Sequence, residues 1–364
     1  MLVKELADFV GSFAPVHFQE DFDNSGLLLG DPEQTVKAVL ISLDVTEDVV
    51  DEAIEKDANF ILAHHPLIFG GLKSITGKND VERSVIKALQ NNIAVYSAHT
   101  SLDNMHDGVN KKIAHKLNLE NTRILQPLQD ELYKLVTFVS SDYANQVREG
   151  LFEAGAGKIG DYDSCSYNLQ GEGTFRGGEG TNPFVGKKGE LHFEKETRIE
   201  TVFPKNITHR VLQQLFKVHP YEEVAYDIYP IKNEYPLAGS GLIGEFSTAL
   251  EEKDFLTHLK SVFGTPVIKH SPWLNKTKKK VAVCGGSGSF LIAKAKAAGA
   301  DAFVTADIKY HQFFEAENKM LITDVGHYES EIFTKEIFYE RLSENFSTFA
   351  IHLSKTNTNP VNYL

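Results

Sequence analysis

The stretch Phe60-Ile61-Leu62-Ala63-His64-His65-Pro66 places two adjacent histidines directly after an apolar run. The run predicts a buried strand, and Pro66 fixes its own φ and biases His65 away from a helical conformation. Because side chains alternate between the faces of a strand, both imidazoles share a face only if the strand ends there and the backbone turns. Two imidazoles at the carboxyl end of a strand suit a metal ion. A single buried histidine is more often a hydrogen-bonded core residue, so the rest of the chain has to decide.

The chain on either side of this stretch alternates between apolar runs and amphipathic patterns. The predicted strands lie at 36–43, 93–98, 280–284, 302–304, 319–323 and 349–353. A short amphipathic helix is predicted at the start of the chain, with Leu2, Leu6, Phe9 and Val10 on its apolar side, and further helices at 46–56 and 81–91. Strands that are apolar on both faces and are separated by helices indicate a parallel sheet. We therefore expect an α/β core built from an N-terminal segment, 1–128, and a C-terminal segment, 236–364.

Residues 129–235 differ from the segments on both sides. They predict two successive strand–helix–strand units, at 133–140, 144–154 and 163–169 and then at 197–203, 211–218 and 224–229. Two such units predict a ferredoxin-like α+β domain that is inserted into the core. A polar, glycine-rich loop through Gly189 is expected between the units. The histidines of this segment do not cluster in the sequence, so we expect it to serve assembly or access to a site rather than catalysis.

The bulk composition is that of a globular protein, with 42% hydrophobic and 24% charged residues among 364. The formal net charge is -13 and no long basic stripe is present, so nucleic-acid binding is not expected. The short run Lys278-Lys279-Lys280 predicts a solvated strand entrance. Only two cysteines, Cys165 and Cys284, occur, which excludes a disulfide framework and a thiolate-rich metal site. With no signal peptide and no apolar run long enough to span a bilayer, we expect a cytoplasmic protein.

Five side chains that could bind metal follow the predicted strands. His64 and His65 end one strand, Asp103 lies just past a second, and His327 lies just past a third. Since open parallel sheets bind ligands at the carboxyl ends of their strands, we expect these side chains to meet at one sheet edge. Glu331 follows His327 by four residues, and a helix that starts at His327 would put both on one face, about 5–6 Å apart.

Three imidazoles and two carboxylates are more ligands than one catalytic zinc ion takes. Shared by two ions about 3.5–4 Å apart, with bridging carboxylates, they fit a two-metal site. Zinc, iron and manganese are all chemically acceptable without thiolates, and zinc is the ion expected in a purified sample. Taken singly, each acid has a structural alternative: Asp103 could cap a helix, and Glu331 could lie on a solvated helix face.

Further polar residues lie near the same strand ends. His99, Asp307 and His311 are predicted to orient ligands or to transfer protons. Lys309 could meet a substrate anion or simply face solvent. The turn Gly285–Gly288 could cradle an anion at a helix N-terminus, or it could be a tight turn with nothing bound. It is not a P-loop, because no Gly-Lys-Ser/Thr follows at the required spacing.

The polar segments at these strand ends share a recognisable pattern. They are His64-His65-Pro66-Leu67, His99-Thr100-Ser101-Leu102-Asp103, Thr305-Ala306-Asp307-Ile308-Lys309-Tyr310-His311 and Gly326-His327-Tyr328-Glu329-Ser330-Glu331. Together they resemble the signature segments of the NIF-three-like proteins, often named type 2 GTP cyclohydrolase I homologues. The resemblance covers essentially the whole chain, including the turn Asp23-Asn24-Ser25-Gly26 and the middle insert of the longer bacterial form. Phe22 and Ala306 depart from the pattern, at positions where Trp and Gly are common.

The resemblance implies a dinuclear metal centre at the five residues already selected, namely His64, His65, Asp103, His327 and Glu331. It also implies a toroidal homohexamer whose sites face an internal cavity, and an insert that resembles the PII/CutA-type ferredoxin-like fold. The function we expect is that of a metal-dependent hydrolase. Its small-molecule substrate stays unknown, because no sequence pattern indicates a guanine-binding site. The alternative is a non-catalytic hexameric assembly that stores or delivers metal or serves regulation.

Overall fold

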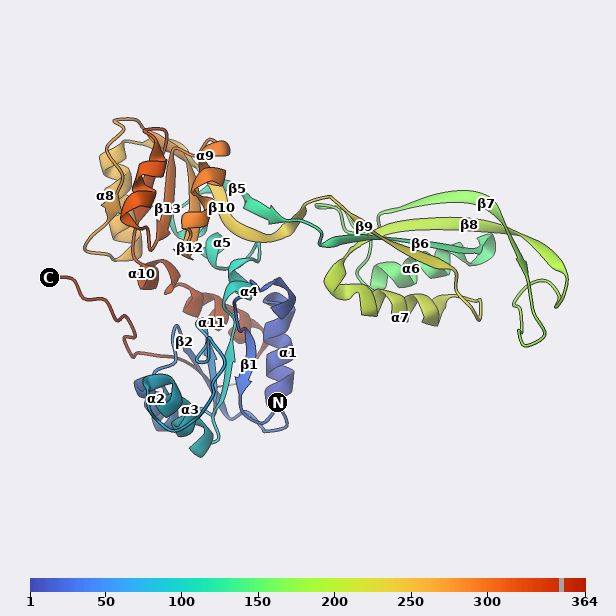
Figure 1. Ribbon diagram of the computed structural model, residues 1–364, viewed down its shortest axis with the longest axis horizontal. Helices are drawn as coiled ribbons and strands as arrows, with labels where there is room; N and C mark the ends of the chain where they lie inside the picture. Colours follow the sequence, from blue (N-terminus) through green and yellow to red (C-terminus); the bar gives the residue numbers. More distant parts are fainter. Residues whose placement is uncertain (347–349) are drawn as a thin grey trace. The chain divides into compact units, whose positions relative to one another are not determined.

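The computed structural model describes residues 1–346 and 350–364 and divides into two compact units (Figure 1). Unit 1 consists of Met1–Gln126 and Leu237–Leu364, and unit 2 consists of Pro127–Pro236. Unit 1 is therefore assembled from both ends of the chain, while unit 2 is one continuous segment. Within the described ranges, no helix combines the length and the apolar character needed to cross a membrane.

The first sheet of unit 1 has five strands in the order β1-β4-β3-β2-β15, of which β1 is antiparallel and the others are parallel. The strands are β1 (Gly26–Leu29), β2 (Ala38–Ser42), β3 (Phe60–Ala63), β4 (Ala94–Ser97) and β15 (Ala350–Leu353). The helices around it are α1 (Val3–Phe13), α2 (Glu47–Glu55), α3 (Asp80–Gln90) and α11 (Thr334–Asn345). The predicted strand 349–353 matches β15 apart from Phe349, which lies outside the described residues.

The helix boundaries follow local sequence signals. The Thr46 side chain accepts a hydrogen bond from the Val49 amide at the start of α2, and Asn79 accepts one from Glu82 at the start of α3. Both are N-caps, which satisfy a helix amide that has no partner within the helix. These caps explain why the predicted helices 46–56 and 81–91 agree with the observed bounds to within one residue.

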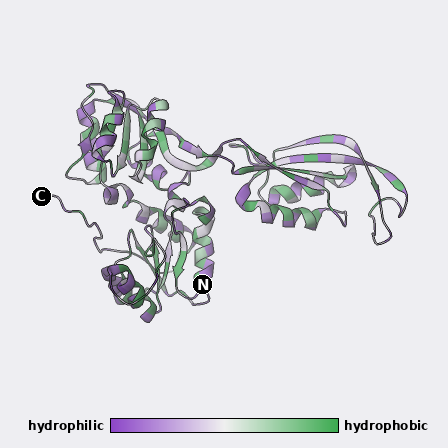
Figure 2. Ribbon diagram, in the orientation of Figure 1, coloured by the Kyte–Doolittle hydropathy of each residue, from purple (hydrophilic) through white to green (hydrophobic). Residues whose placement is uncertain are grey.

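The second sheet of unit 1 has six strands in the order β11-β14-β13-β12-β10-β5, with β12, β13 and β14 parallel. The strands are β5 (Glu120–Leu128), β10 (Tyr235–Leu250), β11 (Lys269–His270), β12 (Lys278–Ser287), β13 (Ala302–Ala306) and β14 (Leu321–Asp324). The remaining α-helices of unit 1 are α4 (Thr100–Asp103), α5 (Val109–Lys116), α8 (Glu252–Phe263), α9 (Ile292–Ala297) and α10 (His327–Glu331). The central strands of both sheets are hydrophobic (Figure 2).

The expectation of one parallel sheet edge was wrong, because the polar strand ends come from two mixed sheets. The first sheet ends at β1 and β15, and β12 to β14 lie in a separate sheet, where β10 and β11 flank them. The two sheets share one hydrophobic core, which contains Val39 and Leu62 from the first and Val283 and Val304 from the second. This common core holds the ends of β3 and β14 in a fixed relation.

Unit 2 consists of a four-stranded antiparallel sheet with two helices on one face (Figure 1). Its elements in chain order are β6 (Leu132–Ser140), α6 (Ala144–Glu153), β7 (Ser166–Arg176), β8 (Leu191–Pro204), α7 (Thr208–Val218) and β9 (Tyr226–Ile231). The strand order is β7-β8-β6-β9. Side chains from alternate positions, such as Leu135 and Val139, pack under α6 and α7.

Two local expectations need correction. The glycine-rich segment after residue 169 is not a loop from its start, because β7 continues to Arg176 in unbroken pairing with β8. Pairing across the hairpin supplies the backbone hydrogen bonds that the local sequence does not predict. The expected solvated run Lys278-Lys279-Lys280 is also only partly exposed. The side chain of Lys278 is buried, and its Nζ lies 3.0 Å from Glu252 Oε1.

Candidate metal centre

The two adjacent histidines lie at a turn directly after β3. The strand ends at Ala63, and the amides of His64 and His65 both donate to the Leu43 carbonyl, at 3.1 and 2.8 Å. The two imidazole centroids are 5.0 Å apart. The turn therefore directs both rings to the same side, whereas a continuing strand would place them on opposite faces.

His64 and Asp103 form the buried part of the cluster. The His64 Nδ1 lies 2.9 Å from the Ala98 carbonyl, to which it donates, so Nε2 carries the lone pair. This Nε2 lies 3.7 Å from Asp103 Oδ1 and 3.7 Å from Glu331 Oε1. In the described part of the chain, His64 Nε2 and Asp103 Oδ1 are buried without a hydrogen-bond partner. Acceptors left unsatisfied in the interior are costly, and a cation between them would remove that cost.

Glu331 joins the buried part to a more open one. Because α10 begins at His327, residues 327 and 331 lie on one helix face, and His327 Nε2 is 3.0 Å from Glu331 Oε2. The same oxygen lies 2.8 Å from His65 Nε2, which in turn is 3.3 Å from His327 Nε2. One carboxylate oxygen thus faces His64, and the other faces His65 and His327.

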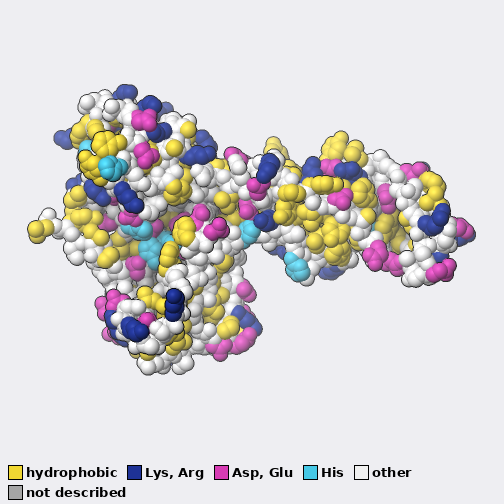
Figure 3. Space-filling view, viewed as in Figure 1, with side chains coloured by type: hydrophobic (Ala, Val, Ile, Leu, Met, Phe, Trp, Pro, Cys, Tyr) yellow, Lys and Arg dark blue, Asp and Glu magenta, His cyan; other side chains and the backbone are white. Residues whose placement is uncertain are grey.

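The structure brings together all five side chains that the sequence selected as ligands. Their ligand atoms form overlapping groups in which all atoms lie within 4.8 Å of one another, and His99 belongs to one of them. The groups are His64 with Asp103 and Glu331, His65 with His327 and Glu331, and His64 with His65 and His99. A histidine cluster bordered by acidic side chains is visible on the surface of unit 1 (Figure 3).

Three of these histidines are held by a carboxylate behind the ring. In each case Nδ1 contacts an acid and Nε2 is left for the centre, an arrangement that fixes the ring orientation of metal-binding histidines. The pairs are His65 with Asp44 at 2.7 Å, His99 with Asp23 at 2.7 Å, and His327 with Asp307 at 2.6 Å. Asp307, which the sequence predicts to orient a ligand or to transfer a proton, is thus in contact with His327.

Asp44 and Asp23 are not among the site residues predicted from the sequence. Asp44 directly follows β2, so the polar strand-end signal that selected His64 was present there as well. Asp23 lies in the polar turn Asp23-Asn24-Ser25-Gly26, and its second oxygen accepts from the Ser25 hydroxyl and the Thr100 amide. The long-range contacts with His99 and Thr100 distinguish it from an ordinary turn residue.

The positive charge of the cluster lies on its two partly exposed histidines, His65 and His327. Burial opposes protonation of His65, but the hydrogen bonds with Asp44 and Glu331 outweigh it and raise the pKa of His65 to about 9. The same balance, with Asp307 in place of Asp44, raises the pKa of His327 to about 11. Without a cation, these imidazoles therefore hold protons near neutral pH.

The buried residues behave differently. Burial lowers the pKa of His64, whereas burial and the nearby Glu331 charge raise the pKa of Asp103. Burial also favours the neutral form of Glu331, yet its contacts with the three histidines hold its pKa well below the usual range. The cluster thus contains a neutral imidazole with a free lone pair beside an ionised carboxylate, which is a donor set suited to a divalent ion.

His311 and Lys309 are not brought to this cluster by any contact among the residues described. The exposed His311 ring packs against Tyr310 and Phe314, with centroids 5.1 and 6.4 Å apart. Lys309 is exposed and its amide donates to Gln312. The proposed roles of both residues therefore gain no support from their surroundings.

The turn Gly285–Gly288 already has internal partners for its amides. The amides of Gly285, Gly286 and Gly288 donate to the side chains of Asn110, Ser330 and Thr305, each at 2.9 Å. These three amides are therefore not available to an anion. The turn instead makes room for the centre: Gly286 has a φ of +58°, and a Cβ there would lie 2.2 Å from Glu331 Oε1.

A cavity of about 480 Å³ borders the more open half of the cluster. His65, His327, Asp44 and Asp307 line one part, and the C-terminal stretch 359–363 contributes to the lining as well. Lys269 also lines the cavity, but its Nζ pairs with Asp324 at 2.5 Å. The cavity size is that of a small-molecule site, and its ionisable lining is mainly acidic.

Comparison with known proteins identifies the family to which this chain is similar. The profile described as Duf34/NIF3 (NGG1p interacting factor 3) matches residues 1–360. The chain is 38% identical to a Bacillus subtilis (strain 168) protein named GTP cyclohydrolase 1 type 2 homolog, over 99% of this chain and 98% of the relative. A relative of the same name from Halalkalibacterium halodurans is 39% identical over 97% and 96%. The crystal structure of a Bacillus cereus protein related to NIF3 superposes with a TM-score of 0.88 at 37% identity, covering 100% of this chain and 99% of that one.

Proposed function

We propose that this chain, which belongs to the Duf34/NIF3 family, is a metal-dependent hydrolase with a dinuclear centre. The observation that carries the proposal is the arrangement around Glu331, whose two oxygens face different sets of donors. His64 and Asp103 would hold one ion with Glu331 Oε1, and His65 and His327 the other with Oε2. His64 Nε2 and Asp103 Oδ1 support this assignment, because both are buried without a hydrogen-bond partner in the described chain and an ion would satisfy both.

Bound divalent ions would supply Lewis acidity and lower the pKa of water toward neutrality. The chain's own residues would prepare the site for this chemistry. Asp44 and Asp307 keep Nε2 of His65 and His327 directed inward. His99, held by Asp23, is our candidate for the residue that accepts or returns a proton during hydrolysis.

The proposed substrate is a small molecule with a hydrolysable C–N bond, such as a cyclic amide or a nucleotide. Relatives named as GTP cyclohydrolase homologues make GTP a compound to test. The cavity beside His65 and His327 contains several carboxylates, and the one lysine among its described lining residues, Lys269, is already paired with Asp324. An anionic substrate would therefore have to be bound through the metal ions rather than through cationic side chains.

The proposal extends to the architecture. We assign unit 2 to the ferredoxin-like class on the β-α-β-β-α-β order of its elements and its antiparallel strand order β7-β8-β6-β9. We retain 1–128, 129–235 and 236–364 as the domain organisation and a toroidal homohexamer as the assembly. Sedimentation velocity of the purified protein tests the assembly, and a monomer or dimer at micromolar concentration would contradict it.

The decisive experiment measures metal and turnover on the same sample. The full chain is purified anaerobically without added metal, analysed for zinc, iron and manganese, and assayed against GTP, other nucleotides and small cyclic amides. Two ions per chain and a turnover that is lost in His65→Ala would support the proposal. Two readily exchanged ions with no turnover above His65→Ala would favour the storage or delivery alternative. A chain that binds no divalent ion would overturn both.

A further inference from the structure

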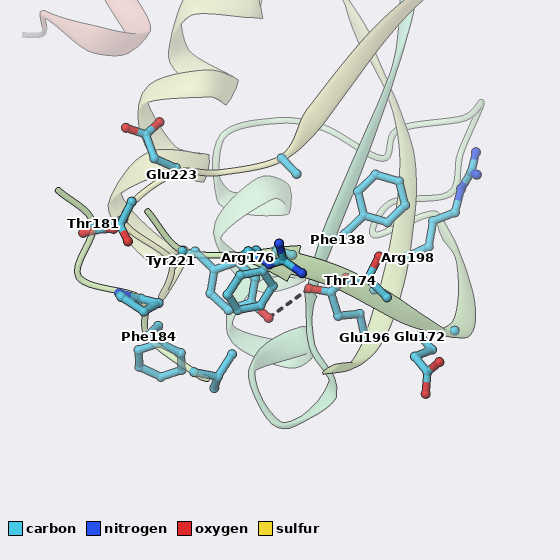
Figure 4. Close-up of a pocket in the computed structure, with 18 of the residues that line it drawn as sticks. Phe138, Glu172, Thr174, Arg176, Thr181, Phe184, Glu196, Arg198, Tyr221 and Glu223 are labelled. Carbon is cyan, nitrogen blue, oxygen red and sulfur yellow. Dashed lines mark hydrogen bonds between the residues drawn. The ribbon is translucent and has the colours of Figure 1, made fainter. Parts of the chain in front are cut away.

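Unit 2 contains a cavity of its own, with a volume of about 640 Å³ (Figure 4). Strands β7 and β8 contribute its floor, and its walls come from the connections 177–190 and 219–225. Every residue that lines it belongs to unit 2. The volume falls in the range of small-molecule sites, and the site does not depend on the metal centre.

The walls of this cavity are aromatic and held in place. The Phe184 ring packs against Tyr221 and Tyr143, with centroids 6.0 and 5.2 Å apart. The connection that carries Phe184 is tied down where the Asn182 amide donates to Glu222 Oε1 at 2.7 Å. The cavity therefore has a preformed apolar surface that suits a planar ligand.

Two glycines lie on β7 in the floor of the cavity. A Cβ on Gly173 would lie 2.1 Å from Glu196 Oε2, so the end of that side chain would have to move. A Cβ on Gly171 would meet no atom of the described residues within 4 Å. Neither close packing nor a positive φ explains Gly171, and the missing side chain leaves space in the floor of the cavity.

Most charged groups around the cavity either pair with a neighbouring side chain or point away from the cavity. Tyr221 donates to Glu196 at 3.0 Å, and Arg198 pairs through Nη2 with Glu200 at 2.9 Å, although its buried Nε has no hydrogen-bond partner among the described residues. Glu172 and Glu223 point away from the middle of the cavity (Figure 4).

Arg176 is the exception among these groups. It lines the cavity, its side chain lies toward the middle in the same view (Figure 4), and it makes no hydrogen bond or ion pair with another described residue. A guanidinium without a partner beside aromatic walls can bind an acidic group through two hydrogen bonds.

We propose that unit 2 binds a small molecule with a planar apolar body and one acidic group. The body lies against Phe184 and Tyr221 over the open floor at Gly171, and the acid meets the Arg176 guanidinium. This gives the inserted unit a ligand-binding function that is separate from the chemistry of the metal centre.

A pair of fluorescent probes separates the two parts of this proposal. The anionic probe 1-anilinonaphthalene-8-sulfonate carries the required acid, and N-phenyl-1-naphthylamine has the same rings without it. Titrations use the full chain and the variants Arg176→Gln and Arg148→Gln. Arg148 lies on α6 and does not line the cavity, so it is the matched control. Arg176→Gln should weaken the anionic probe about tenfold or more and leave the neutral probe within about twofold.

A cavity-filling variant tests the location. Gly171→Leu should weaken both probes about tenfold or more, because the new side chain would occupy the floor, and the melting temperature confirms that the variant folds. Phe184→Ala is the second variant if Gly171→Leu does not fold. Wild-type affinity in the folded cavity variant would overturn the proposed location. An equal loss of both probes in Arg176→Gln, or the same loss in Arg148→Gln, would overturn the proposed recognition of an acid.

Discussion

The centre of unit 1 and the cavity of unit 2 use polar side chains in opposite ways. In unit 1, His64 Nε2 and Asp103 Oδ1 are buried acceptors without a partner among the described residues, and acids hold the neighbouring imidazoles. In unit 2, the Arg176 guanidinium, which pairs with no described residue, borders an aromatic cavity with a glycine in its floor. Several acceptors that face one point favour a bound cation, whereas a guanidinium beside apolar walls favours an organic anion. The comparison teaches that the missing partner of a polar group indicates the chemistry of its ligand.

Removal of the bridging carboxylate should have the largest effect. Glu331→Gln leaves one neutral amide where two charged oxygens faced two sets of donors, so we expect the bound metal to fall from two ions per chain to none. Metal analysis after gel filtration measures this. Glu336→Gln, on the surface of α11, is the control and should retain both ions. Full metal content in Glu331→Gln would mean that the two oxygens of Glu331 do not hold the ions.

Removal of an orienting acid should have the next largest effect. In Asp44→Asn and Asp307→Asn the imidazole loses the charge behind it, and changes of this kind typically cost about 10–100-fold in metal affinity. Competition with a chelator of known affinity gives the dissociation constants. Affinities equal to that of the wild type would mean that these acids do not act on the centre.

The pH dependence should follow from the raised pKa values of the two partly exposed histidines. At pH 7 the metal-free cluster holds protons on His65 and His327, whose pKa values are about 9 and about 11, and a metal must displace them. Affinity should therefore rise between pH 7 and 9, by up to about tenfold per pH unit for each proton released. Calorimetry in buffers of different ionisation enthalpy counts these protons, and a pH-independent affinity would contradict the charge distribution.

The raised pKa of His65 also predicts how the stability of the metal-free protein changes with pH. Because the pKa of His65 in the folded protein lies above the unfolded value of about 6.5, protonation of His65 stabilises the folded state fully below about pH 6.5. Metal-free protein should therefore lose stability as the pH rises through about 9, and bound metal should reverse the trend. Urea unfolding with and without chelator measures both.

A pair of glycine substitutions should separate backbone strain from damage to the centre. Gly286→Ala and Gly264→Ala both place a Cβ at a positive φ, +58° and +62°, which costs about 1–2 kcal/mol. Only at Gly286 would the Cβ meet Glu331, since nothing lies within 4 Å of a Cβ on Gly264. We expect both variants to lose stability in urea and only Gly286→Ala to bind metal several-fold more weakly. Equal metal affinities would show that Glu331 can move aside.

The smallest effect is expected in unit 2. Arg176 is exposed and makes no hydrogen bond or ion pair with another described residue, so Arg176→Gln should change the free energy of unfolding by no more than about 0.5 kcal/mol. Urea unfolding checks this. A larger loss would mean that Arg176 supports the fold, and it would weaken the contrast between a structural polar group and one that is kept for a ligand.

The sequence by itself determined which residue types stand at the strand ends. Apolar runs, helix caps and Pro66 act over a few residues, so His64, His65, Asp103 and His327 could be placed after strands from local patterns alone. The i, i+4 relation of Glu331 to His327 needed only a helix that starts at residue 327, which the structure contains. The family could be identified from the same polar segments, and the matches over nearly the whole chain confirm it.

Only the tertiary structure decided which of these residues face one another. The contact of His65 with Glu331 joins positions 266 residues apart and depends on two sheets that share a core, where the sequence predicted one sheet edge. The acids behind the rings, the internal partners of the Gly285–Gly288 amides and the burial of Lys278 all depend on contacts of this kind. Local patterns encode hydrogen bonding and burial along a segment, whereas long-range pairing depends on how the segments pack.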